Sequence, residues 1–239
     1  MYIFGGLDAD HRIKHSVVII DLTTNECHLP RVSGRPVPKT VYSSGVLRAE
    51  AEAIFFGGID IHGFMTDALI RLFIHHTGRV HCTNFEASAG TPSPRLGHCM
   101  VLGPRGHDAY MYGGFSATSA APLIWTCNDQ CPSIENPIVL DKHCVSILLP
   151  RPNVGNDADR ALRRLSYDGI GSLREAGDSG LWSVVPATGT PPSARAFFSM
   201  TTASDDNLIL FGGMTTRQGE LCRPNAFIFD TSAGAWSCL

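Results

Sequence analysis

Four short apolar runs in this sequence each end in two consecutive glycines. The copies span residues 2–6, 54–58, 110–114 and 209–213. Their first glycines lie 52, 56 and 99 residues apart, so the last interval is close to two units, or to one unit with an insertion. A repeat of about 50 residues, marked by aromatic residues and glycine pairs, is typical of an array of small β-sheets built from one recurring unit.

A second run of strand-forming residues follows three of the glycine pairs after a polar loop. Val17–Asp21, Ala68–Ile74 and Ala226–Asp230 are rich in β-branched and aromatic side chains and have the length of a strand. A turn that contains glycine or asparagine comes next, and a third short run follows it. This order predicts three consecutive antiparallel strands in these units.

A proline-rich loop with a basic residue, Lys39, Arg95 or Arg195, leads from three of these units toward the next glycine pair. Proline lacks a backbone donor and interrupts strand pairing, so we interpret this loop as the connection between sheets. One more strand-forming run lies between the loop and the glycine pair. The unit is therefore predicted to have four strands, a to d, with the glycine pair closing strand b.

These marks together resemble the kelch repeat family, whose pattern joins a glycine pair to a spaced tyrosine and tryptophan and to a Gly-Pro-Arg-His stretch. The second proline loop carries that stretch as Gly90, Pro94, Arg95 and His98, and Trp236 stands in the last copy. The resemblance covers nearly the whole chain, except roughly 116–142 and 150–180.

The resemblance implies an all-β fold, a kelch-type β-propeller of about four blade-like four-stranded units in a single domain, residues 1–239. It also implies that Arg95 and Arg195 bond loop carbonyls and that His98 packs within the blades. The chain opens on strand b and ends on strand d, so we expect an incomplete or open ring. Open strand edges invite pairing with another chain, which makes self-association through these edges an expectation.

The long third interval is expected to hold a loop insertion at about 150–180. We interpret Cys144–Leu149 as strand c of this unit and Leu181–Val185 as strand d. Between them, Arg160–Leu165 could form a helical turn capped by a preceding aspartate. A hidden fifth blade is disfavoured because neither a glycine pair nor a proline loop marks a blade boundary there.

Composition narrows the function classes. A net charge of −3 and a pI near 6.3 give no basic field, so we expect no nucleic-acid partner. No apolar run reaches about 18 residues, so no membrane span is expected, and the first residues do not resemble a signal peptide. Eight cysteines without a regular framework are expected to be mostly reduced, which favours a cytoplasmic, intracellular protein.

A zinc site is the chemistry that the cysteines could suggest. Cys127, Cys131, His143 and Cys144 are candidates, but the first two are separated by three residues and the last two are adjacent. Structural zinc usually takes two well-separated ligand pairs. We therefore expect no metal and no cofactor.

Strand parity predicts which loops share a face. In antiparallel sheets the b–c and d–a loops emerge on one side, and here these loops are the long ones. Loops on a rigid scaffold commonly carry binding residues. Exposed arginines and aromatics are enriched at binding hot spots, so we expect Arg12, His62, Phe64 and Arg217 to contact a protein partner.

Two functions compete at this point. The kelch resemblance implies a non-enzymatic interaction scaffold that binds a protein partner through the b–c and d–a loop face. The alternative is a kelch-containing enzyme, galactose-oxidase-like or epimerase-like. No nucleophile-elbow, zinc-protease or phosphate-loop motif occurs in the sequence, and no catalytic residues are predicted, so we favour the scaffold.

Overall fold

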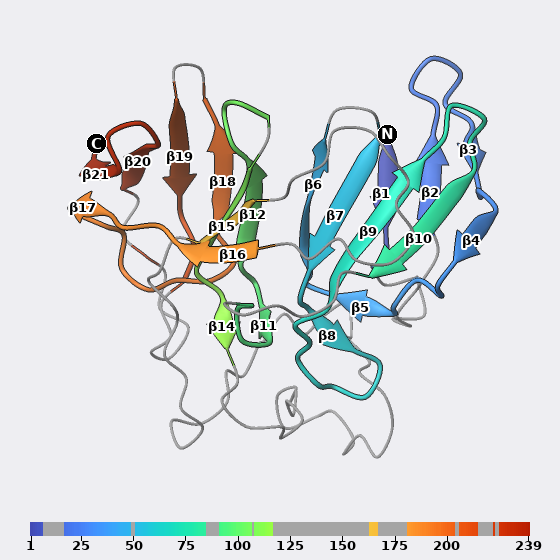
Figure 1. Ribbon diagram of the computed structural model, residues 1–239, viewed down its shortest axis with the longest axis horizontal. Coiled ribbons are helices and arrows are strands. Elements are labelled where there is room, and N and C mark those ends of the chain that lie inside the picture. The colour runs from blue at the N-terminus through green and yellow to red at the C-terminus, as the bar shows by residue number, and fades with distance from the viewer. Residues whose placement is uncertain are drawn as a thin grey trace, which may run out of the picture.

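The computed structural model describes residues 1–6, 17–48, 51–84, 91–106, 108–116, 163–166, 181–203, 206–214, 222 and 225–239. All regular secondary structure within these ranges is β-strand (Figure 1), so the predicted all-β fold is confirmed. None of the described residues forms a helix with the length and apolar character needed to cross a membrane.

The described residues form four main sheets, which follow one another in chain order. Sheet 1 has three antiparallel strands: β1 (Tyr2–Phe4), β2 (Val17–Ile20) and β3 (Cys27–His28). Sheet 2 has four antiparallel strands and a fifth that pairs in parallel with β10: β6 (Ser44–Arg48), β7 (Glu52–Phe56), β9 (Leu69–Ile74), β10 (Val80–Asn84) and β4 (Val32–Gly34).

The second half of the chain repeats this plan. Sheet 3 is antiparallel throughout: β12 (Cys99–Leu102), β13 (Ala109–Tyr112), β15 (Arg163–Ser166) and β16 (Leu181–Val184). Sheet 4 again has a parallel fifth strand, paired with β21: β18 (Ser199–Thr202), β19 (Asn207–Phe211), β20 (Ala226–Asp230), β21 (Ala235–Cys238) and β17 (Thr188–Gly189).

The edge strands β6, β12 and β18 of sheets 2, 3 and 4 lie next to one another, with β12 between β6 and β18. Ser44 of β6 accepts a hydrogen bond from the Met100 N–H at 2.9 Å, and Thr202 of β18 donates one to the Leu102 carbonyl. Sheets 1 and 4 lie at opposite ends of the row, so the two chain ends are far apart (Figure 1).

Neighbouring sheets pack face to face through apolar clusters. Because successive side chains of a strand point to opposite faces, one strand can pack against two neighbouring sheets. In β13, Tyr110 and Tyr112 pack against sheet 4, whereas Ala109 and Met111 pack against sheet 2. Phe56, the residue before the second glycine pair, likewise packs against sheet 3. The residue before each of these two glycine pairs thus belongs to the core shared with the following sheet.

Strand β15 corrects one prediction from the sequence. Arg163–Ser166 pairs with β13 on one side and with β16 on the other, so it supplies the third strand of sheet 3. The helical turn predicted over Arg160–Leu165 is therefore wrong for its last three residues, because pairing between two strands overrides a local helical preference. The segment Cys144–Leu149, predicted as this strand, lies outside the described residues.

The glycine pairs are needed for backbone conformation. Both glycines of all four pairs have positive φ, for example 65° at Gly113 and 85° at Gly114. A Cβ atom on Gly113 would also lie 2.4 Å from the Arg195 carbonyl oxygen. The sequence repeat thus marks the point where strand b turns sharply and the backbone of the next unit approaches closely.

We expect Gly113→Ala to lower the free energy of unfolding by ~3 kcal/mol or more, because it adds a clash with backbone to the positive-φ strain. Gly106→Ala is the matched control, since its φ is 72° but its added Cβ would meet nothing within 4 Å. This control should lose only about 1 kcal/mol. Urea denaturation measures both, and equal losses would contradict the close-approach argument.

Candidate functional site: the loop face at the glycine pairs

We use "loop face" for the end of the sheets that carries the glycine pairs and the proline loops. Two small sheets lie there: β5 (Thr40–Val41) with β8 (Ile59–Asp60), and β11 (Arg95–Leu96) with β14 (Phe115–Ser116). A bridge between Ala196 and Met214 is their counterpart in the last unit. Figure 1 shows the four short strands below the four main sheets.

Buried arginines tie the proline loops to the glycine pairs. The guanidinium of Arg95 donates to the Gly113 carbonyl at 3.0 Å and to the Ser93 carbonyl at 3.1 Å. The backbone carbonyl of the same Arg95 accepts from the Gly58 N–H at 2.8 Å. One residue therefore joins the glycine pairs of two consecutive units, and the expectation that Arg95 bonds loop carbonyls is confirmed.

Arg195 repeats this arrangement one unit later. Its guanidinium donates to the Gly212 carbonyl at 2.9 Å and to the Ser193 carbonyl at 3.1 Å, and its own carbonyl accepts from Gly114 at 2.9 Å. The predicted carbonyl bonding is confirmed here too. Because the arrangement recurs, we interpret these two guanidinium groups as part of the structural framework and not as groups available to a ligand.

The first proline loop departs from this pattern. The sequence pattern aligns Lys39 with the two arginines, but in the structure Thr40 occupies their place, because Thr40–Val41 pairs with β8 as Arg95–Leu96 pairs with β14. Lys39 is exposed, whereas Thr40 is buried. The proline spacing in this loop differs by one residue, which is why the alignment from sequence alone was wrong.

His98 lies deep in the framework behind the loop face. Its ring meets the Phe56 ring edge-on at 5.6 Å between centroids, and it would contact a Cβ added to Gly57. Burial lowers the pKa of His98 to about 3, and the nearby charge of Arg95 acts in the same direction. The side chain is therefore neutral at pH 7 and packs within the sheets, as the family resemblance implied.

Aromatic residues form the floor of the loop face. Phe197 lies between Tyr42, with centroids 5.7 Å apart in an edge-on arrangement, and Phe115, at 5.9 Å. Tyr42 and Phe197 both have positive φ although neither is glycine, and Gly97 occupies the equivalent place in the unit between them. Burial raises the pKa of the Tyr42 hydroxyl. Nothing in the sequence marks these aromatics as one cluster.

The b–c loop of the second unit projects from this floor as a tight turn. One carboxylate oxygen of Asp60 accepts hydrogen bonds from the His62 N–H at 2.8 Å and the Phe64 N–H at 2.9 Å. Asp60 and Phe64 are also joined through their backbones at 2.9 Å, and Gly63 has a φ of 84°. These contacts hold the turn in one conformation.

The tip of this turn presents apolar and aromatic side chains. Ile61 and Phe64 are each 38% exposed, and His62 is exposed beside them. The structure thus places two of the four predicted binding residues, His62 and Phe64, on one ordered turn. Ile61 and the positioning role of Asp60 were missed, although an aspartate followed by glycine three residues later is a turn signal. Arg12 and Arg217 lie outside the described residues.

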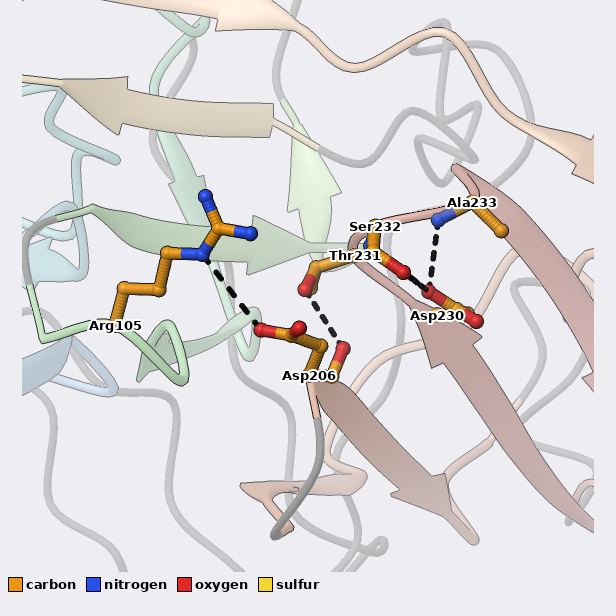
Figure 2. Close-up of polar contacts among 6 residues, drawn as sticks. All are labelled: Arg105, Asp206, Asp230, Thr231, Ser232 and Ala233. Carbon is orange, nitrogen blue, oxygen red and sulfur yellow. Dashed lines mark hydrogen bonds and ion pairs between the residues drawn. The ribbon is translucent and has the colours of Figure 1, made fainter.

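The opposite end of the sheets is built from short, locally bonded turns. Asp230 accepts hydrogen bonds from the Ala233 N–H at 2.8 Å and from the Ser232 hydroxyl at 2.7 Å and N–H at 2.8 Å (Figure 2), and these bonds lower the pKa of its carboxyl. Arg105 reaches Asp206 on the neighbouring sheet at 3.8 Å, and Thr231 bonds the Asp206 carbonyl. This end carries turns that bond mainly to themselves and to the neighbouring sheet.

Within the described ranges, no group of three or more His, Cys, Asp or Glu side chains could hold a metal ion. The candidate zinc ligands Cys127, Cys131, His143 and Cys144 lie outside those ranges. The described loop face offers exposed apolar and aromatic atoms on a stiff turn.

No family model matches this chain, and no curated protein matches it. Among solved structures, one described as "Structure of YjhT" is similar, with a TM-score of 0.60 and 12% sequence identity. The similarity covers 99% of this chain and 55% of that chain, so this chain spans about half the length of its structural neighbour. At this identity, the likeness concerns the fold alone.

We expect Arg195→Lys to lower the free energy of unfolding by about 1–3 kcal/mol, because an ammonium cannot replace the fork that bonds the Gly212 and Ser193 carbonyls. Arg105→Lys is the matched control, since Arg105 is 77% exposed and its ion pair is long. Thermal and urea denaturation should show little change for the control. A loss no larger for Arg195→Lys would refute the linking role of Arg195.

Stability should also fall in mild acid because of His98. Its pKa is about 6.5 when unfolded and about 3 when folded, so stability decreases as the pH drops from about 6.5 toward 3. Between pH 7.5 and 5.0 this group should contribute a loss of about 2 kcal/mol. His98→Phe, which copies the side chain of Phe198 at the equivalent place, should flatten the profile by that amount. Parallel profiles for both proteins would contradict a buried neutral histidine.

Proposed function

We propose that this chain is a kelch-type β-propeller segment with four blade-like units, and that it serves as a scaffold that binds a protein partner through the loop face. The phased glycine pairs, the two arginine links and the row of four sheets support this interpretation. The fold of the structural neighbour is compatible with it. Fold does not by itself imply function, so the binding role depends on the loop face.

The observation that carries the proposal is the ordered turn at Asp60. Interfaces gain most of their affinity from a few rigid apolar or aromatic anchors surrounded by weaker contacts. Ile61 and Phe64 present such groups, and the hydrogen bonds from Asp60 fix their backbone before a partner arrives. A fixed turn loses less entropy on binding than a mobile one.

The partner that fits this surface is a folded protein or peptide with an apolar patch, in a reducing compartment. The five described cysteines are free thiols, and two of them, Cys27 and Cys238, are exposed. Free exposed thiols are compatible with the cytoplasmic location expected from the sequence. Neither a nucleic-acid nor a membrane partner is part of the proposal.

Quantitative pull-down from the native cell extract tests the proposal. Phe64→Ala, alone and with Arg217→Ala, should reduce partner recovery about tenfold or more. Leu47→Ala is the matched control, because Leu47 is a 52% exposed apolar residue at the end of β6 and β7 away from the glycine pair. Asp60→Ala should weaken recovery as well, since it frees the turn while leaving Phe64 in place. If the Phe64 variants recover as much partner as the wild type and their circular dichroism spectra are unchanged, the proposal is contradicted.

A further inference from the structure

The two end sheets each leave one face without the neighbour that the repeat supplies elsewhere. Phe211 precedes the fourth glycine pair, as Phe56 and Tyr112 precede the second and third. Phe56 and Tyr112 are 0% exposed because the next sheet covers them, whereas Phe211 is 52% exposed. Its neighbour in the strand, Leu210, packs into the core with sheet 3, so Phe211 lies on the outer face of sheet 4.

The rest of this outer face is apolar and hydroxylic except at one end, where Asn207 and Asp230 lie in the same rows. The register aligns Ile209 with Ile228, and Phe211 with Ala226, across β19 and β20. The flanking strands contribute Ser199, Thr201 and Ser237 to the same rows. An apolar centre bordered by small hydroxyl groups can be covered by another sheet while Asp230, whose carboxylate bonds to the turn at Ser232 and Ala233, stays at the end of the strand.

Sheet 1 leaves the opposite kind of face open. Phe4 turns toward sheet 2 and stacks on Phe55 at 4.1 Å between ring centroids, so the alternating Ile3 lies on the outer face. Ile3 is 42% exposed, whereas Met111 and Leu210 at the equivalent place are 0% exposed. The register adds Val18, Ile20 and Cys27 to this face, all without charge.

We propose that the outer face of sheet 4 in one copy of this chain packs against the outer face of sheet 1 in a second copy. Phe211 lies on the sheet face that bears the residue directly before a glycine pair, and Ile3 lies on the face that bears the residue one position earlier. At every junction between consecutive sheets of the chain, a face of the first kind packs against a face of the second kind. A second copy therefore presents the same type of partner face that the fold already uses three times. The area involved is a whole sheet face rather than a strand edge.

The contact is heterologous, since it joins two different faces, and its repetition gives a ring or an open array.

This inference does not rest on partner binding at the loop face, because Phe211 and Ile3 lie on sheet faces and Phe64 lies at a loop tip. The faces also differ from the open strand edges, through which the sequence analysis expects self-association. The two ideas are separable, since an edge contact depends on backbone groups and a face contact depends on these side chains.

Sedimentation velocity over a range of concentrations tests the proposal with the full chain. The wild-type chain should associate, and Phe211→Asp or Ile3→Asp should each weaken association about tenfold or more. Leu47→Asp is the matched control, because Leu47 is 52% exposed and lies on sheet 2, and it should associate like wild type. Phe211→Ser and Ile3→Ser give the same test with a neutral side chain if an aspartate variant does not fold.

Mixing the two blocked variants tests the head-to-tail geometry. A Phe211→Asp chain keeps a free sheet 1 face and an Ile3→Asp chain keeps a free sheet 4 face, so an equimolar mixture should form a heterodimer at concentrations where each alone is monomeric. Three results would overturn the proposal: a wild-type chain that stays monomeric at all concentrations, a mixture that associates no better than the single variants, or a single variant that associates with itself as strongly as the wild type.

Discussion

The fold depends on one recurring link, in which an arginine bonds two glycine pairs at once. Its guanidinium holds the glycine carbonyl of its own unit, and its backbone carbonyl holds the glycine N–H of the unit before. Because both glycines adopt positive φ, strand b ends where these groups converge. The apolar packing between sheets supplies most of the stabilisation, but this link sets where each sheet begins relative to the last.

The same link gives the loops of the loop face a fixed base. Below the arginines, the small two-stranded sheets and the floor aromatics close the core, so the b–c loops start from fixed points. The turn at Asp60 adds its own hydrogen bonds to this base. Rigid support beneath a variable loop lets the loop change its side chains without disturbing the sheets.

The sequence predicted the features that depend on local chemistry. The glycine pairs, the strands that follow them, the bonding of Arg95 and Arg195, and an exposed Phe64 could all be predicted from residue types and spacing. The sequence did not show that strand a is interrupted at Tyr42 in sheet 2 and at Phe197 in sheet 4. Both aromatic residues have positive φ there, a conformation that neighbouring residues impose and that aromatic residues do not prefer.

Long-range pairing set the other limits of prediction. Strand β4 pairs in parallel with β10 in the next unit, and β15 is a strand only because β13 and β16 flank it. Such pairings depend on distant partners and leave little mark in a short sequence window. For the candidate site, His62 and Phe64 lie on an exposed turn, and contact of Arg12, His62, Phe64 and Arg217 with a partner remains a prediction.

Thr40 has a consequence for how the molecule comes apart. The junctions between sheets 2 and 3 and between sheets 3 and 4 each have an arginine that bonds backbone carbonyls. The junction between sheets 1 and 2 has Thr40 instead, and its buried hydroxyl oxygen has no hydrogen-bond partner among the described residues. In a linear array, units open in order of their neighbour coupling. Sheet 1 should therefore detach first, and its amide protons should exchange with solvent ahead of those in sheets 3 and 4.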